Sequence, residues 1–508
     1  MIINHIKILK MNTLKKITFI AVMILLGAVS ASAQTALEDI NIQDAIEDQF
    51  RLDHAVNANN IDISVSDGIV ELTGKVNNLK AKERATRITR LVKGVRSVSN
   101  RIDVDPPADM GDATIESKVQ RALLNDPATD LYEVDVSVNS KIVTLTGTVE
   151  SFQEKELCGD IAKSVKGVVN LVNNIDIELQ GDRSDTEIRD EVKEALEWNV
   201  NVDDGLIEVV VDNGRVNLSG VVGSAAEKNT AFYTAWVTGV EYVDTSDLKV
   251  EWWAKDEDLR KYKNAPRTDA EIRNAINDAM AYDPRIFSFD IEPEVDNGQV
   301  TLRGTVDNLR AKNAAERLAE NTTGVTGVTN RIKVRWTDIL PEDSEIEAEI
   351  NAALADNSIT QSWEIDVSVV NGIATLSGVV DSYLEKQEAE WVASGVEGVV
   401  EVNNIITVSY PYSYYWWGHY PYYDIYIKPP EVTDPTADYP TDLQITDQIQ
   451  NKLWWSPYVD LDQVTVTVED GHATLEGTVD SMREYLEASR KAIEGGAVSV
   501  TNNLEIKE

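Results

Sequence analysis

A short pattern, apolar-x-Leu-x-Gly-x-Val, occurs six times in this chain of 508 residues, each time after an alternating apolar run and a two-residue turn. The steps between successive pattern glycines are 73, 73, 84, 74 and 99 residues. Self-similarity at a fixed period is the signature of a repeat architecture. The chain is therefore predicted to be an array of six small domains, with extra residues in the third and fifth intervals. The pattern glycines are Gly74, Gly147, Gly220, Gly304, Gly378 and Gly477.

Each unit opens with a predicted helix whose apolar residues recur at every fourth position, as Ile115, Val119 and Leu123 do. Two alternating strands follow, then a second helix and a last strand. A strand–helix–strand connection returns the last strand parallel to its partner. We therefore predict an α+β fold: a tandem array of six small α-β-β-α-β domains, each a three-stranded mixed sheet with two helices on one face.

The turn between the first two strands is an Asp-Gly or Asn-Gly dipeptide in five units, as in Asp67-Gly68. Such dipeptides favour a type I′ turn, because that turn needs positive φ at both positions. The second unit has Ser140-Lys141 instead, and we expect this turn to be strained or of another type. By strand alternation Gly74 points toward the helices, and we expect the missing side chain to let a helix approach closely.

The late segment Gly-Val-x-x-Val-x-Asn, which is Gly94-Val95 to Asn100 in the first unit, completes a set of motifs that resembles the BON domain. That resemblance implies an envelope protein without a shared catalytic motif, linked to phospholipid or membrane-surface interaction and to osmotic stress. The expected division is: 1–33 signal peptide, 37–106 BON 1, 112–180 BON 2, 184–250 BON 3, 251–267 linker, 268–336 BON 4, 342–408 BON 5, 409–440 aromatic insertion and 441–508 BON 6. We call the six domains repeats one to six.

The first residues have the composition of a secretory signal. Lys15-Lys16 precede a mostly apolar stretch, and Ala31-Ser32-Ala33 forms an A-x-A cleavage site. We expect export to the periplasm with cleavage near Ala33, since the apolar run is shorter than the roughly 20 residues that a membrane span needs. Cleavage changes the net charge from −40 to −44. A charge of that sign repels nucleic-acid phosphates, so no nucleic-acid partner is expected.

No catalytic or cofactor motif is visible in the sequence. The histidines after the signal, His54, His419 and His472, are scattered, and no pair has metal-ligand spacing. Cys158 is the sole cysteine and occupies a small, buried helix position in the repeat alignment. No phosphate-binding or nucleophile motif appears. We therefore predict a protein that is not an enzyme and holds no metal or cofactor.

The second helix of repeat one concentrates positive charge in an otherwise acidic chain. Lys80, Arg84, Arg87 and Arg90 are the candidate residues for binding an anionic surface, with Lys80, Arg84 and Arg87 expected on the solvent side of the helix. The alternative is that these side chains pair with an acidic neighbouring repeat.

The insertion after repeat five is dense in tyrosine and tryptophan. Its rings are candidates for an exposed interaction surface, because such side chains bind at low rotamer cost. The alternative is a loop that folds back on its own domain. The candidate residues are Tyr414, Tyr415, Trp416, Trp417, Tyr420, Tyr422 and Tyr423.

The sequence together with the resemblance predicts a non-enzymatic periplasmic protein that binds the membrane lipid surface or an envelope protein, in envelope or osmotic stress. Two alternatives stay open. One is a soluble chaperone-like stress protein without a dedicated ligand, and the other is a carbohydrate-binding protein that uses the aromatic insertion.

Overall fold

A computed structural model describes residues 37–51, 53, 56, 60–107, 110–129, 134–178, 183–255, 263, 266–281, 286, 291–335, 341–360, 364–408 and 440–507. The predicted signal peptide and the candidate aromatic residues Tyr414 to Tyr423 lie outside the described residues.

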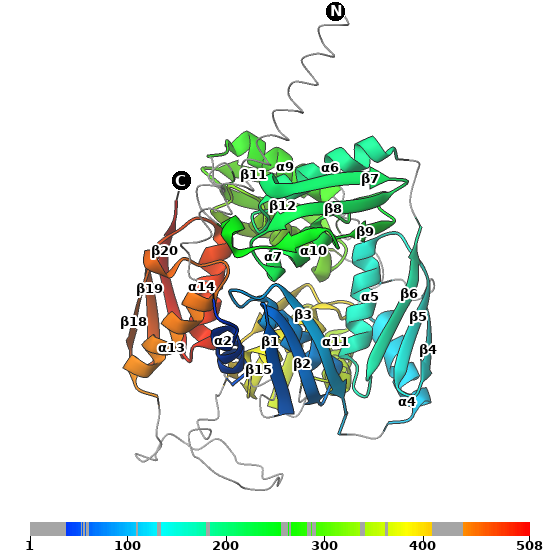
Figure 1. Ribbon diagram of the computed structural model, residues 1–508. Helices are drawn as coiled ribbons and strands as arrows, with labels where there is room; N and C mark the ends of the chain where they lie inside the picture. Colours follow the sequence, from blue (N-terminus) through cyan, green and yellow to red (C-terminus); the bar gives the residue numbers. More distant parts are fainter. Residues whose placement is uncertain are drawn as a thin grey trace, which may run out of the picture.

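The first three repeats share the order helix, strand, strand, helix, strand (Figure 1). Repeat one contains α2 (Asp39–Arg51), β1 (Ile61–Ser66), β2 (Ile69–Val76), α3 (Leu79–Arg90) and β3 (Ser97–Val104). Repeat two contains α4 (Asp112–Leu124), β4 (Val134–Asn139), β5 (Ile142–Val149), α5 (Phe152–Ser164) and β6 (Asn170–Ile177). Repeat three contains α6 (Asp185–Trp198), η3 (Asp204–Leu206), β7 (Ile207–Asp212), β8 (Arg215–Val222), α7 (Ala225–Thr234), β9 (Tyr242–Asp244) and β10 (Leu248–Val250), and η4 (Trp252–Lys255) follows it.

The last three repeats keep that order. Repeat four contains α9 (Asp269–Ala281), β11 (Ile291–Asp296), β12 (Gln299–Val306), α10 (Leu309–Glu320) and β13 (Gly327–Val334). Repeat five contains α11 (Asp343–Asp356), β14 (Ile365–Val370), β15 (Ile373–Val380), α12 (Tyr383–Ser394), β16 (Glu401–Asn404) and β17 (Thr407–Val408). Repeat six contains α13 (Asp442–Trp455), η8 (Leu461–Gln463), β18 (Val464–Glu469), β19 (His472–Val479), α14 (Met482–Glu494) and β20 (Ser499–Ile506).

Each sheet has the predicted mixed topology. The middle strand pairs antiparallel with the first strand and parallel with the last, as β2 does with β1 and β3. The last strand is split in repeats three and five. In repeat three the cause is one extra residue in the last strand. Val243 pairs with Val216 and Leu248 pairs with Gly220, so the last strand advances five residues where the middle strand advances four. Each repeat encloses a separate apolar core between its sheet and its two helices, which confirms the predicted fold class.

The hairpin turns have positive φ at both positions in all six repeats. Ser140 and Lys141, at φ 52° and 63°, adopt the same left-handed backbone as the Asx-Gly pairs. The expected change of turn type is therefore wrong, although two non-glycine residues with positive φ do make this turn strained. An aspartate at the start of each first helix accepts both turn N–H groups; Asp112 accepts from Ser140 and Lys141 at 2.8 Å each. The corresponding residues elsewhere are Asp39, Asp185, Asp269, Asp343 and Asp442.

The pattern glycine has a different role from the one predicted. Gly74 has φ 121°, and a Cβ there would lie 2.0 Å from the carbonyl oxygen of Asn60, at the start of the neighbouring strand. Gly220 and Leu206 repeat this contact at 2.1 Å. The glycine is thus required by its positive φ and by a close backbone oxygen within the sheet, and the expectation that it makes room for a helix is wrong.

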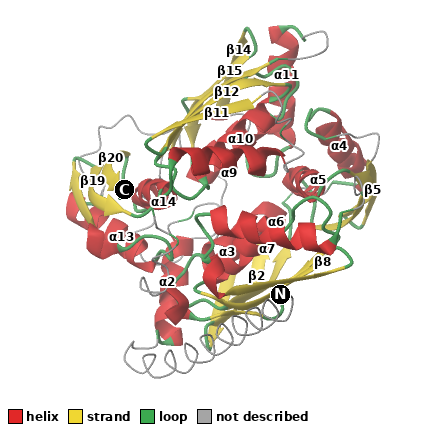
Figure 2. Cartoon of the chain, turned by 90° about the horizontal axis from the view of Figure 1, so that it is seen from above, coloured by secondary structure: helices red, strands yellow, loops and turns green. Residues whose placement is uncertain are grey.

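The six sheets lie on the outside of the molecule and the helices lie toward its middle (Figure 2). The repeats pair in a nested order: one with six, two with five, and three with four. In each pair, the chain that follows the second helix of one repeat meets the end of the first helix of the other. The backbone contacts are Lys93 to Trp455 at 3.1 Å, Lys166 to Asp356 at 2.8 Å and Thr323 to Trp198 at 2.8 Å.

The first residue of a second helix often packs against a neighbouring repeat. Leu79 of repeat one joins the core of repeat two, Leu309 of repeat four joins that of repeat five, and Ala225 of repeat three joins that of repeat one. Phe152 of repeat two stacks on Trp236 of repeat three, with ring centroids 4.0 Å apart. These contacts hold the second helices around a common centre.

Candidate functional site

A cavity of about 1250 Å³ lies between the helices at the middle of the molecule. Side chains from all six repeats line it, chiefly from the second helices. Concave sites that several elements build together are the usual binding sites of proteins. This central cavity is therefore the candidate functional site.

The same helix position lines the cavity in successive repeats. It is the thirteenth residue after the pattern glycine, and it differs in chemistry from repeat to repeat. In the first five repeats it is Arg87, Asp160, Tyr233, Arg317 and Trp391. In the first five repeats, one face of the second helix therefore lines the central cavity. The side chain at this position differs between repeats, and these differences determine the charge and polarity of the cavity wall.

The cavity wall is electrically mixed, whereas the chain has a net charge of −40. Eight basic and eight acidic side chains line it. The basic residues are Lys80, Arg84, Arg87, Arg90, Lys163, Arg310, Arg317 and Arg483, and the acidic residues are Glu83, Glu156, Asp160, Glu191, Glu194, Asp278, Glu388 and Glu390. Positive charge that is rare on the chain as a whole is therefore enriched around this cavity.

All four predicted basic residues of α3 line the cavity. Of the three that were expected on the solvent side, Arg87 is exposed, whereas Arg84 is buried. Arg84 is only 8% exposed, because the helix face that carries it packs toward repeat six. Its Nε donates to Asp53 at 2.7 Å and its Nη2 lies 3.9 Å from Glu494. Arg90 donates to Asn229 of repeat three at 2.8 Å. Contacts with neighbouring repeats, one of them acidic, are what the alternative interpretation of this helix expected.

Lys80 and Arg310 meet at Trp391, although they belong to different repeats. The Lys80 Nζ lies 4.9 Å, and the Arg310 guanidinium 4.3 Å, from the indole centroid. Both are cation–π distances. Arg310 also donates to the buried carboxylate of Asp126 at 2.5 Å. Burial raises the pKa of Asp126 despite this guanidinium.

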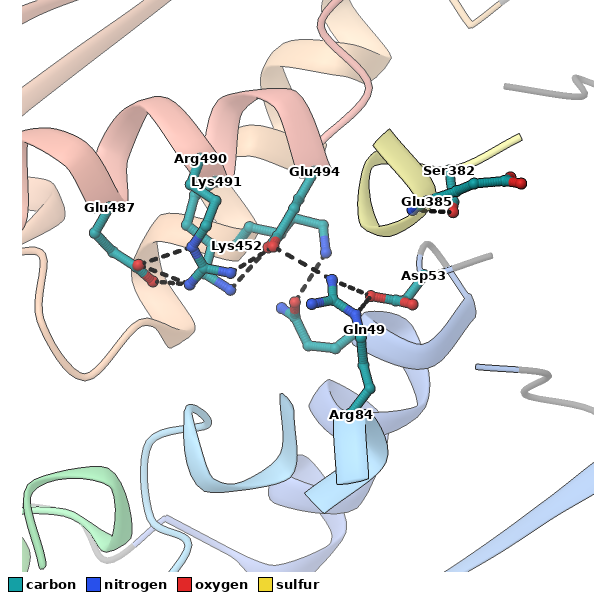
Figure 3. Close-up of polar contacts among 10 residues, drawn as sticks. All are labelled: Gln49, Asp53, Arg84, Ser382, Glu385, Lys452, Glu487, Arg490, Lys491 and Glu494. Carbon is teal, nitrogen blue, oxygen red and sulfur yellow. Dashed lines mark hydrogen bonds and ion pairs between the residues drawn. The ribbon is translucent and has the colours of Figure 1, made fainter. Parts of the chain in front are cut away.

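A network of charged side chains joins repeats one and six beside the cavity (Figure 3). Arg490 binds Glu487 at 2.6 Å and Glu494 at 2.5 Å, both on its own helix. Lys491 lies 3.1 Å from Glu494. Across the interface, the Lys452 Nζ donates to Gln49 at 2.8 Å. The network therefore couples α13 and α14 of repeat six to α2 and α3 of repeat one.

Burial and mutual charge shift the titration of this network. Lys452 is 3% exposed, and burial lowers its pKa to about 7. Burial opposes the ionisation of Glu494, but Arg490 and Lys491 outweigh it and hold the pKa of Glu494 well below its usual range. Burial also lowers the pKa of Arg87 to about 10, with repulsion from Arg84 and Arg490 adding to the effect.

The described part of the chain was also searched for metal-binding groups, membrane-spanning helices and a reactive thiol. Within those residues no group of three His, Cys, Asp or Glu side chains could hold a metal ion, and no helix is long and apolar enough to cross a membrane. Cys158 is fully buried in repeat two, and burial raises the pKa of its thiol to about 12. Such a thiol is a core residue rather than a nucleophile.

Sequence reasoning missed three features of the structure. The aspartates that bind the hairpin turns could have been found, because each stands 28 residues before the first turn residue. Trp391 and Lys452 gave no such signal, because their partners come from repeats distant in sequence.

The BON domain profile matches residues 38–106, 111–178, 184–251, 268–335, 342–410 and 441–508. Osmotically-inducible protein Y of Escherichia coli strain K12 is 31% identical over 141 residues, which are 27% of this chain and 70% of that protein. An uncharacterized protein in the gshII 5′ region of Anaplasma centrale is 31% identical over 146 residues, 28% of this chain and 95% of that protein.

The C-terminal domain of CdsD, the structural protein of the type III secretion system of Chlamydia trachomatis, aligns over 48% of this chain and 100% of its own. At 15% identity and a TM-score of 0.12, that alignment carries no argument. The six profile matches cover most of the sequence, and they agree with the six sheets. The chain belongs to the BON domain family.

Proposed function

We propose that this chain is a non-enzymatic protein of the bacterial envelope that acts in osmotic stress by binding membrane lipid or an envelope protein. The observation that carries the proposal is the central cavity, to which all six repeats contribute side chains. The similarity to osmotically-inducible protein Y supports the physiological setting. The leader-like residues 1–33 support export.

Binding is proposed at the cavity rather than at the outer sheet faces. The outward positions of the strands are mostly Ser, Thr, Asn and charged residues, as in Asp62, Ser64 and Ser66 of β1. A flat anionic bilayer would also be repelled by the net charge of −40. The carbohydrate alternative concerns Tyr414 to Tyr423, outside the described residues, and stays a prediction.

Two measurements test the proposal. A deletion strain should grow normally at low osmolarity and poorly at high osmolarity, and the wild-type gene should restore growth. Equal growth of both strains would contradict the stress role.

A photo-crosslinking residue placed at Gln387 in the cavity should form adducts with lipid or protein in osmotically stressed cells. The same residue at Ser368, exposed on the outer face of β14, is the control. Adducts at Ser368 alone would contradict binding at the cavity.

A further inference from the structure

A closed cycle of contacts joins repeats one, two and three. Each contact is made by the first residue of a second helix, five positions after the pattern glycine. Leu79 of repeat one lies in the core of repeat two, and Ala225 of repeat three lies in the core of repeat one. Phe152 of repeat two completes the cycle, because it stacks on Trp236 of repeat three. We call these three repeats the first half of the chain and repeats four to six the second half.

The second half begins with a counterpart of repeat one. Leu309 of repeat four lies in the core of repeat five, as Leu79 lies in the core of repeat two. Lys80 and Arg310 directly follow these leucines, and both lie over Trp391 of repeat five. An asparagine caps both helices, whereas a serine caps the second helix in each of the other four repeats. An exchange of repeat one with four and of repeat two with five therefore preserves the leucine contacts.

The same exchange relates the one–six pair to the three–four pair. The Lys93 N–H of repeat one donates to the Trp455 carbonyl of repeat six, as the Thr323 N–H of repeat four donates to the Trp198 carbonyl of repeat three. Lys93 and Thr323 each stand 19 residues after their pattern glycine, and both tryptophans stand 22 residues before theirs. All three pairs join a repeat of the first half to one of the second. The two halves therefore meet through equivalent surfaces, as identical subunits do across a two-fold axis.

We propose that each half of this chain docks the complementary half of a second copy of the same chain, so that two copies exchange halves. Residues 251–267 are the single covalent connection between the halves. A half from another copy offers the same contacts as the chain's own half. Exchange of an identical element between protomers is a low-cost route to dimers, because no new interface has to form. The docking surface is the face that carries the three pairs.

The inference goes beyond the proposed function, because the docking surface requires neither a ligand in the cavity nor osmotic stress. Normal growth of the deletion strain at high osmolarity would overturn the stress role and leave the docking surface standing. Failure of the halves to exchange would overturn the docking and leave the stress role standing.

Ion pairs distinguish the face between the halves from contacts within a half. Lys118 and Arg121 of repeat two both pair with Asp356 of repeat five, across the two halves. Lys163 of repeat two pairs with Glu83 of repeat one at 2.8 Å, inside the first half. Loss of the Asp356 carboxylate should weaken the association of the halves, whereas loss of the Glu83 carboxylate should weaken only the first half. These two carboxylates provide matched variants.

The exchange is tested on the full chain with a protease site placed between Lys255 and Lys263 and cut after folding. One cut copy carries a donor dye at Ser66→Cys in the first half, and the other carries an acceptor dye at Ser368→Cys in the second half. Both serines are exposed, and the natural Cys158 is fully buried. Energy transfer should rise after overnight mixing, and uncut copies should give much less, because their linked halves rebind each other. No transfer between cut copies would overturn docking by a second copy.

The dissociation constant of the cut halves, from sedimentation velocity over a dilution series, tests the docking surface. Asp356→Asn should weaken the association about ten-fold, since two cations lose a partly buried partner. Glu83→Gln should change it less than two-fold. Equal effects of the two variants, or unsubstituted cut halves that separate at micromolar concentration, would overturn the proposed surface.

Discussion

The interfaces between repeats one and six and between repeats three and four share one backbone contact but differ in their side chains. In the three–four pair, the neutral amide of Asn201 donates to Asn321 at 2.9 Å, and the Thr323 hydroxyl donates to the Trp198 carbonyl at 3.0 Å. In the one–six pair, the corresponding region holds Lys452, Glu494 and Arg84. We call the Asn201–Asn321 and Thr323–Trp198 contacts the neutral interface, and the contacts of Lys452, Glu494 and Arg84 the charged interface.

The difference shows that one domain fold supports two kinds of contact. Neutral amides exchange hydrogen bonds with water for hydrogen bonds with each other at modest net gain. Buried ions depend on one another, because removal of one leaves its partners without compensation. The charged interface should therefore respond to pH and to single substitutions much more than the neutral one.

The largest expected effect is the loss of Glu494. Glu494→Gln removes the carboxylate that Arg490, Lys491 and Arg84 share, and we expect a loss of about 3–5 kcal/mol in the free energy of unfolding. Asn321→Ala at the neutral interface should cost about 1 kcal/mol. Urea unfolding of the full chain, followed by tryptophan fluorescence, measures both. Similar shifts of the first transition for the two variants would break the comparison.

The next effect is a pH dependence at Lys452. Its pKa is about 7 in the fold, below the ordinary 10.5, so between these values the unfolded chain binds more protons than the folded one. Stability should therefore rise with pH from 7 to 10, by about 3–4 kcal/mol. Glu494 and Asp53 favour the protonated amine, whereas Lys491 and Arg490 oppose it.

Thermal midpoints at pH 7 and pH 10 measure this dependence. Lys452→Met should raise the midpoint at pH 7 and flatten the rise toward pH 10. Asn201→Ala, at the neutral interface, should leave the wild-type slope unchanged. A wild-type midpoint that falls over this range would contradict a lowered pKa of Lys452.

The smallest effect concerns the hairpin contact that all repeats share. Two turn N–H groups hold the pKa of Asp185 and of Asp269 below the usual range. The stabilisation is present above the unfolded pKa of 3.8 and is lost as pH falls through the folded values. Asp185→Asn keeps one acceptor oxygen instead of two, so the amides of Asn213 and Gly214 should exchange with solvent a few-fold faster. Unchanged exchange of both amides would mean that the aspartate contributes nothing to the turn.

Much of the fold could be predicted from local sequence. The spacing of Ile115, Val119 and Leu123 predicts a first helix, and all three are fully buried there. The Asp67-Gly68 dipeptide predicts a turn with positive φ at both residues, at 52° and 71°. These features depend on contacts within about 70 residues, and the six copies of the pattern allow them to be recognised in the sequence.

The candidate site was predicted only in part. Lys80, Arg84, Arg87 and Arg90 were identified as a cluster, but Arg84 was expected on the solvent side and is buried, between Asp53 of its own repeat and Glu494 of repeat six. Helical periodicity reports which residues share a face and does not report what covers that face. The role of Gly74 was misplaced for a related reason, since strand alternation does not show that a Cβ on Gly74 would lie 2.0 Å from the carbonyl oxygen of Asn60.

The sequence by itself determined six BON domains, their turns and the strong charge on one helix, because these properties come from short-range pattern and composition. Only the tertiary structure decided that repeat one pairs with six, two with five and three with four, and that the second helices surround one cavity. The physical reason is that contacts such as Lys452 with Gln49 join residues some 400 positions apart, where no local rule of spacing applies.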